Sequence, residues 1–83
     1  MEVEIAPIAR DEIGALPIAI MARVLEKIAG LASYPNVSGM KRLTGAWRGF
    51  TRLRTGDYRI VFRVEGNRVI VVRVQKRKDV YED

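Results

Sequence analysis

The residues best suited to chemistry in this chain are arginines that recur at about every second position of its C-terminal half. They are Arg52, Arg54, Arg59, Arg63 and Arg73. A guanidinium is planar, permanently charged and able to donate two parallel hydrogen bonds to one phosphate. A spacing of two residues places side chains on the same face of a β-strand. The pattern therefore predicts a sheet with one open, arginine-rich face that binds phosphate groups.

The composition narrows the chemistry that such a face could perform. The chain has no cysteine and no histidine, which excludes disulfides, thiol or imidazole catalysis and a zinc site built from those ligands. No cluster of carboxylates in the sequence favours a divalent metal, and we expect neither a metal nor a cofactor. Arginine is a poor general base because it stays protonated, so Tyr81 and Lys76 are the candidates for proton transfer.

The charge of the chain is unevenly distributed. The net charge is +5, with three basic and five acidic side chains in residues 1–40 and twelve basic and five acidic in residues 41–83. A basic surface of this kind attracts nucleic acid, anionic lipid or an acidic protein segment. No apolar run reaches the roughly 18 residues that cross a bilayer. The N-terminus is acidic where a secretion signal would be basic, so we expect a cytoplasmic protein.

The elements that must position the arginines follow from apolar spacing and turn residues. With 83 residues we expect one domain over residues 1–83. The pattern predicts a strand over 3–8, helices over 10–16 and 17–32, a loop over 35–47, and strands at about 48–54, 58–64 and 68–76. The second helix has an apolar stripe at helical spacing, formed by Met21, Val24, Ile28 and Leu31. The order βααβββ predicts an α+β domain, an antiparallel sheet with two N-terminal helices packed on one face.

Alternation along the last three strands assigns their side chains to two faces. The face expected to pack against the helices carries Thr51, Leu53, Tyr58, Ile60, Phe62, Val64, Ile70, Val72 and Val74. The opposite face is expected to carry Phe50, Arg52, Arg54, Arg59, Val61, Arg63, Val69, Val71, Arg73 and Gln75. Glycine-containing tight turns at 55–57 and 65–67 should join these strands. The arginine face would then include a small apolar patch made by Val61, Val69 and Val71.

Three segments of the chain resemble the RelE/ParE superfamily of bacterial and archaeal toxins. They are Leu43-Thr44-Gly45, the run from Arg52 to Phe62 with its Gly-Asp-Tyr-Arg turn, and the run from Val74 to Tyr81 with its Arg-Lys-Asp-Val-Tyr end. The resemblance covers most of the chain and implies the RelE-like βααβββ fold. It also implies a toxin–antitoxin module whose toxin is held by an extended antitoxin segment.

The resemblance further implies roles for single residues. Arg59 falls on the family's arginine that contacts the scissile phosphate, and Arg77 falls on its second catalytic arginine. Tyr81 falls on the C-terminal tyrosine that stacks on a base or takes part in proton transfer. Arg52 falls where RelE-type enzymes often carry a lysine. Other basic residues would supply a general RNA-binding surface, namely Arg54, Arg63, Arg73, Lys76, Lys78 and Lys41.

The chain departs from the RelE pattern at two positions. Phe50 stands where RelE-type enzymes often carry a further lysine, and a phenylalanine cannot bind phosphate. Lys76 stands where many relatives have a histidine, which removes a plausible acid or base. Both departures favour, to some degree, a ParE-like member of the superfamily.

The prediction that follows is a type II toxin that acts as a metal-free, ribosome-dependent mRNA endonuclease and inhibits translation. Its partners would be mRNA on the ribosome and a cognate antitoxin with an acidic, extended segment. The alternatives are a ParE-like inhibitor of DNA gyrase and a non-catalytic relative that binds only its antitoxin or an RNA. Fold alone does not choose among these functions.

Overall fold

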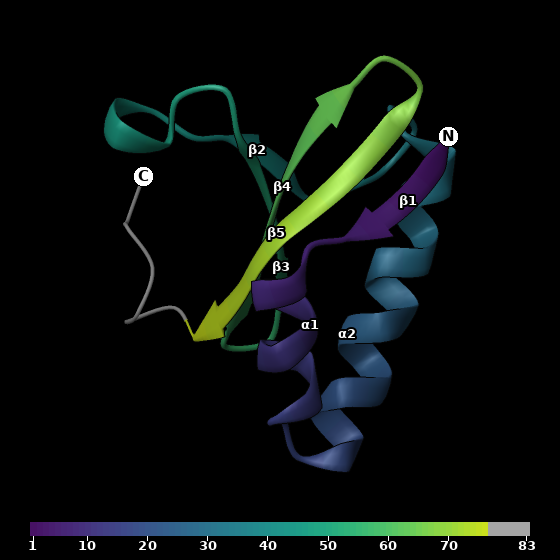
Figure 1. Ribbon diagram of the computed structural model, residues 1–83, viewed down its shortest axis with the longest axis vertical. Helices are drawn as coiled ribbons and strands as arrows, with labels where there is room; N and C mark the ends of the chain where they lie inside the picture. Colours follow the sequence, from purple (N-terminus) through teal and green to yellow (C-terminus); the bar gives the residue numbers. More distant parts are fainter. Residues whose placement is uncertain (77–83) are drawn as a thin grey trace.

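The computed structural model describes residues 1–76, in which two helices pack on one face of a five-stranded sheet (Figure 1). The α+β architecture with both helices on one face is confirmed. The predicted site residues Arg77, Lys78 and Tyr81 lie outside the described residues. The strands and helices are β1 (Glu2–Ile5), α1 (Pro7–Gly14), α2 (Ile18–Gly30), β2 (Met40–Arg42), β3 (Thr51–Thr55), β4 (Tyr58–Glu65) and β5 (Arg68–Lys76).

The sheet is mixed, whereas the sequence predicted an antiparallel one. Its strand order is β1-β5-β4-β3-β2, and β1 runs parallel to β5 while the other neighbours are antiparallel. The pairing of β1 with β5 aligns Val3 with Val69 and Ile5 with Val71, so these side chains contribute to one core. Alternation along a strand gives no information about the direction of its neighbour, which is why this pairing was not predicted.

Strand β2 was predicted as part of a loop over residues 35–47. Only Met40 of this three-residue strand packs against the core, whereas Lys41 and Arg42 are exposed. A strand with a single buried residue has no periodicity to detect. The segment that follows contains a short 3₁₀ turn, η2 (Gly45–Trp47), and projects away from the sheet (Figure 1).

The helices and turns form where the sequence places the residues that suit them. Pro7 occupies the first turn of α1, where its missing N–H costs nothing, so α1 begins three residues before the predicted start. The predicted stripe of α2 is confirmed, because Val24, Ile28 and Leu31 are buried in the core. The β3–β4 and β4–β5 turns have Gly56 at φ 57° and Gly66 at φ 59°, the left-handed backbone that glycine adopts without strain.

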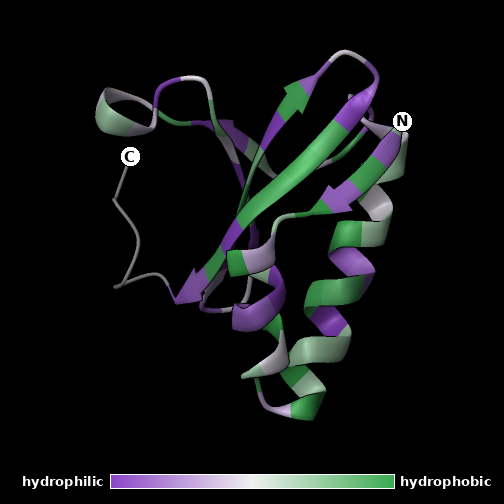
Figure 2. Cartoon of the chain, in the orientation of Figure 1, coloured by the Kyte–Doolittle hydropathy of each residue, from purple (hydrophilic) through white to green (hydrophobic). Residues whose placement is uncertain are grey.

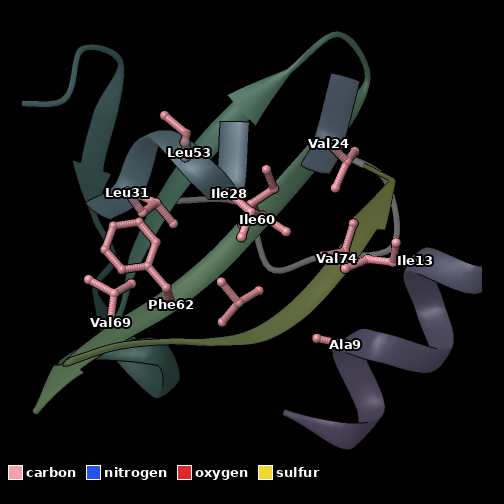
Figure 3. Close-up of a cluster of buried hydrophobic side chains, with 11 residues drawn as sticks. Ala9, Ile13, Val24, Ile28, Leu31, Leu53, Ile60, Phe62, Val69 and Val74 are labelled. Atoms are coloured by element: carbon pink, nitrogen blue, oxygen red, sulfur yellow. The ribbon is translucent and has the colours of Figure 1, made fainter. Parts of the chain in front are cut away.

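The main core lies between the helices and the sheet (Figure 3). The ring of Tyr34 meets the ring of Phe62 edge to face, with centroids 6.1 Å apart. Figure 2 shows that hydrophobic and hydrophilic residues alternate around α2, as expected for a helix with one buried side. No helix within residues 1–76 is long and apolar enough to cross a membrane.

A β-bulge in β5 reverses part of the predicted face assignment. Val61 pairs with Arg73 and Phe62 pairs with Val71, which leaves Val72 as the extra residue. As a result Val69 and Val71 lie in the main core, and they do not join Val61 on the opposite face as predicted. The predicted positions of Ile70 and Val72 against the helices are also wrong, since Ile70 pairs with Arg63 and Val72 packs with Val61. Residues 69–72 are all apolar, so the sequence gives no sign of the position at which the alternation between the two faces changes.

Candidate nucleic-acid interface

The sheet face that points away from the helices carries adjacent cations from three strands. Lys41 of β2 pairs with Arg52 of β3, and Arg54 of β3 pairs with Arg59 of β4. Paired residues lie on the same face of a sheet, and so do residues two apart on one strand, such as Arg52 and Arg54. The four side chains are therefore neighbours on one face. We call this surface, made by Lys41, Arg52, Arg54 and Arg59, the basic face. It corresponds to the centre of the arginine face predicted from the sequence.

Within the basic face, two guanidinium-bearing residues stand directly opposite each other. Arg54 and Arg59 form a directly opposed cross-strand pair, so two positive charges are concentrated at this point of the sheet. Their exposure differs, because Arg54 is exposed whereas Arg59 is only 2% exposed. The predicted open surface is therefore wrong at Arg59. The residue lies on the central strand β4 between Arg54 of β3 and Gln75 of β5, whose chains flank its stem.

Arg73 belongs to a different contact. Its Nε and Nη2 atoms donate hydrogen bonds of 3.1 and 2.8 Å to Oε2 of Glu12, and the other carboxylate oxygen of Glu12 accepts a 2.7 Å bond from the backbone N–H of Val74. The hydrogen bond to Glu12 raises the pKa of Arg73 above its ordinary value. Sequence reasoning missed this role of Glu12, because its partner lies 61 residues along the chain and no local pattern connects them.

Arg63 is also engaged by acidic side chains, near the β4–β5 turn. Its Nε lies 2.8 Å from Oε2 of Glu65, while Arg68 lies 2.7 Å from Oε2 of Glu4 and 3.4 Å from Oε1 of Glu65. The hydrogen bond from Arg63, followed by its charge, lowers the pKa of the Glu65 carboxyl. The two predicted RNA-binding residues Arg63 and Arg73 are therefore engaged in ion pairs with Glu65 and Glu12.

Lys76 does not share the basic face. It pairs with Tyr58, and Tyr58 lines a hollow of about 190 Å³ together with Ile20 and Arg23 of α2. The pairing thus puts Lys76 on the helix side of the sheet, at the end of β5. Among the predicted site residues that the structure describes, Lys41, Arg52, Arg54 and Arg59 are brought together, whereas Arg63, Arg73 and Lys76 are not.

An apolar cluster borders the basic face. Leu43 and Val61 form its buried centre, and Trp47, Phe50 and Val72 pack against them. The rings of Trp47 and Phe50 meet edge to face at a centroid distance of 5.4 Å. The residue that departs from the RelE lysine pattern, Phe50, is therefore a packing residue of this cluster.

The arrangement can bind an anion but offers little else for catalysis within residues 1–76. No group of three acidic, histidine or cysteine side chains in this part of the chain could hold a metal ion. The guanidiniums of Arg54 and Arg52, which are exposed and partly exposed, can bind phosphate oxygens by charge-assisted hydrogen bonds. Binding and charge stabilisation are thus what the described residues provide.

Comparison with known proteins places the fold and the motif in a family. The family model for the ParE toxin of the type II toxin–antitoxin system parDE matches residues 3–81. No curated protein matches the chain. The toxin–antitoxin complex RelBE2 from Mycobacterium tuberculosis is similar, with 29% identity, a TM-score of 0.79 and coverage of 92% of this chain and 96% of that chain.

Two further solved structures share the fold. The RelE–RelB complex from Pyrococcus horikoshii has 25% identity and a TM-score of 0.75, covering 95% of this chain and 97% of that chain. The isolated RelE toxin from E. coli has 19% identity and a TM-score of 0.74, covering 90% of this chain and 82% of that one, and shows the fold alone. Since the family model spans nearly all of the sequence, the chain belongs to the ParE toxin family of type II toxin–antitoxin systems, within the RelE/ParE superfamily.

Proposed function

We propose that this toxin cleaves mRNA on the ribosome and binds the RNA backbone through its basic face. The observation that carries the proposal is the cross-strand pair of Arg54 and Arg59 with Lys41 and Arg52 in the adjoining row. Lys41, Arg52 and Arg54, which are at least partly exposed, suit the closely spaced phosphates of a single RNA strand. The 29% identity to the toxin–antitoxin complex RelBE2 supports the RelE-type assignment.

Metal-free RNA cleavage requires alignment of the 2′-hydroxyl, charge stabilisation and two proton transfers. In our proposal Arg59 and Arg77 offset charge on the phosphoryl oxygens, and Arg52 and Arg54 hold the neighbouring backbone. Lys76 lies across the sheet from these residues, so Tyr81 is assigned to proton transfer. The ribosome would supply much of the alignment, since holding the reactants in position lowers the reaction barrier more than a weak general base does.

The proposed partner that controls this activity is a cognate antitoxin. The similar structures from M. tuberculosis and P. horikoshii are complexes of a toxin with its antitoxin. A toxin with a net charge of +5 fits an antitoxin with an acidic, extended segment. Binding of such a segment should weaken as salt rises, because exposed charges are screened.

A second candidate function is inhibition of DNA gyrase without catalysis. Two observations favour it, the ParE description of the matching family model and the place of Phe50 in an apolar cluster where a RelE-type lysine would be. A gyrase inhibitor needs a protein-binding surface but no phosphate site.

The first experiment adds purified toxin to a defined translation system and maps the 5′ ends of the message by primer extension. We expect cuts at A-site codons that fall about 10²–10³-fold in Arg59→Ala, the usual effect of removing one charge-stabilising donor. The matched control is Arg23→Ala, which removes an arginine from the helix side of the protein and should cut normally.

Intact message in the presence of wild-type toxin would contradict the endonuclease proposal. Inhibition of purified gyrase in a supercoiling assay would then support the second function. Cleavage that persists at full rate in Arg59→Ala, with its fold verified by circular dichroism, would remove Arg59 from the site while leaving the activity in place.

A further inference from the structure

A hollow of about 410 Å³ lies where the connection between β2 and β3 leaves the sheet (Figure 1). Arg42 lines it from the end of β2, Arg48 and Gly49 line it from the second half of the connection, and Thr51 lines it from the start of β3. This volume falls within the range of about 300–1,000 Å³ that is usual for small-molecule sites in proteins. The hollow is therefore large enough to be considered as a ligand site.

The hollow is on the opposite side of the sheet from the basic face. Arg42 pairs with Thr51, and Thr51 pairs with Phe62, which lies in the main core between the sheet and the helices. The preceding residue of β2, Lys41, pairs with Arg52 on the other face. A ligand in the hollow would therefore be held by residues that the basic face does not use.

Two cationic side chains at the hollow, those of Arg42 and Arg48, are available to bind an anion. Both are exposed, and within residues 1–76 no hydrogen bond or ion pair engages either of them. Arg63 and Arg73, by contrast, are held by carboxylates. A guanidinium binds phosphate oxygens through charge-assisted hydrogen bonds, and the hydroxyl of Thr51 adds a further donor. This part of the lining suits a phosphate group.

The rest of the lining suits a flat aromatic group. Tyr34 and Phe50 both contribute to the hollow, and each ring is supported by an edge-to-face contact, Tyr34 with Phe62 and Phe50 with Trp47. A Cβ atom at Gly49 would meet nothing within 4 Å, so the backbone leaves room in front of these rings. Nucleobases stack on aromatic side chains in this way whatever their sequence.

We propose that the hollow binds a nucleotide with a terminal phosphate, the phosphate between Arg42 and Arg48 and the base against Tyr34 and Phe50. The nucleotide is either free or the end of an RNA strand, since both present the same phosphate and base. The site is separate from the basic face, so its failure would leave the proposed endonuclease function intact.

Other anions fit less well. A terminal phosphate carries about −1.5 to −2 charges and three acceptor oxygens, enough for both guanidiniums and the Thr51 hydroxyl. A carboxylate of an acidic peptide has one charge and two oxygens, and a phosphate inside an RNA strand has two free oxygens. Neither brings as many acceptors to the hollow.

The test titrates the ¹⁵N-labelled full chain with AMP and follows its backbone amide signals by NMR. We expect the signals of Gly49 and Thr51 to shift, because both residues line the hollow. Adenosine, which lacks the phosphate, should bind there at least about tenfold more weakly, the usual effect of removing hydrogen bonds to a charged group.

Substitutions then assign the binding to the two arginines. Arg42→Ala and Arg48→Ala should each weaken AMP binding by about tenfold, and Arg48→Lys should recover part of the loss, because it keeps the charge without the planar fork. The matched control is Arg23→Ala, since Arg23 is an exposed arginine on the helix side that does not line the hollow. It should stay within about twofold of wild type. All three positions are exposed, so the variants should fold.

Two RNA oligonucleotides of one sequence identify the source of the nucleotide. If the strand with a 5′-phosphate shifts the Gly49 and Thr51 signals and the strand with a 5′-hydroxyl does not, the ligand is an RNA end. If AMP shifts these signals and neither strand does, the ligand is a free nucleotide. Both results support a nucleotide site.

Three outcomes would overturn it. AMP that leaves the Gly49 and Thr51 signals in place would show that the hollow binds no nucleotide. An equal loss in Arg23→Ala and Arg48→Ala would reduce the binding to general attraction by a basic protein. A glutamate-rich peptide that binds the hollow more tightly than AMP would make it a protein-docking surface.

Discussion

The carboxylate of Glu12 joins α1 to β5 through three hydrogen bonds. It connects α1 to the side chain of Arg73 and to the backbone of β5 at Val74, immediately after the bulge. Only four residues of β5 pair with β1, so the backbone at Val74 lies beyond the end of β1. Glu12 thus takes the place of a strand neighbour for that N–H group. The other carboxylate oxygen of Glu12 holds Arg73, so this arginine does not contribute to the basic face.

We expect Glu12→Ala to lower the free energy of unfolding by about 2–3 kcal/mol, because it leaves a half-buried guanidinium and a backbone N–H without their acceptor. Glu12→Gln keeps an acceptor for Val74 and should lose less. Asp11→Ala, at the exposed neighbouring position, is the control and should stay within about 0.5 kcal/mol. Urea denaturation measures all three variants, and equal losses in Glu12→Ala and Asp11→Ala would refute this role of Glu12.

At the scale of elements, the two hairpin turns set the pairing of the three long strands. Gly56 starts the two-residue connection between β3 and β4, and Gly66 starts the one between β4 and β5. Both have positive φ, the conformation that suits tight hairpins with a right-handed strand twist. The register of the basic face depends on the first turn, since it brings Arg54 opposite Arg59, five residues further along the chain.

A pair of glycine-to-alanine substitutions separates backbone strain from packing. A Cβ atom at Gly56 would have open space, with its nearest neighbour 4.0 Å away at Nη1 of Arg23, yet its φ of 57° strains any other L-residue. Gly56→Ala should therefore destabilise the protein by about 1–2 kcal/mol. Gly14→Ala, at the end of α1 where a Cβ also meets nothing within 4 Å, should stabilise it by about 0.5–1 kcal/mol.

Thermal unfolding checks this pair, because 1 kcal/mol moves the midpoint of a domain of this size by roughly 4–8 °C. The two midpoints should move in opposite directions. A Gly56→Ala midpoint equal to that of the wild type would mean that the turn relaxes to another geometry.

At the scale of the whole molecule, the charges are segregated around the sheet. Acidic residues of α1, β1 and the end of β4 pair with Arg63, Arg68 and Arg73. The cations of β2 and β3 lie toward the opposite edge of the sheet, where Lys41, Arg52 and Arg54 are at least partly exposed. A molecule with this distribution attracts polyanions to one face and so orients them before contact.

Salt dependence measures how many of these cations meet phosphates. For single strands the logarithm of the binding constant falls by about 0.7 per contact for each unit of log salt, so three contacts predict a slope of about −2. Titration of a labelled RNA oligonucleotide between 50 and 200 mM salt gives this slope. Arg54→Ala should make it shallower by about 0.7, whereas Arg23→Ala should leave it unchanged. A slope near zero would exclude the basic face as an RNA site.

The sequence by itself determined the features that depend on neighbours along the chain. Helical spacing identified the buried stripe of α2, glycines marked the two turns, and alternation placed Arg52, Arg54 and Arg59 on one face. The motif from Arg52 to Phe62 also led to the toxin superfamily that the comparisons confirm. The site roles of Arg59, Arg77 and Tyr81 stay predictions.

Only the tertiary structure decided what depends on distant segments. The parallel place of β1 comes from its pairing with β5, far away in sequence, and the short strand β2 and the bulge at Val72 come from strand pairings that no periodicity signals. The contact of Glu12 with Arg73 is made when α1 packs against the sheet, and the burial of Arg59 is likewise a property of the folded chain. Periodicity reports which side of a strand a residue occupies. Which chain lies beside it, and hence which charges are neutralised, is decided by the packing of the whole fold.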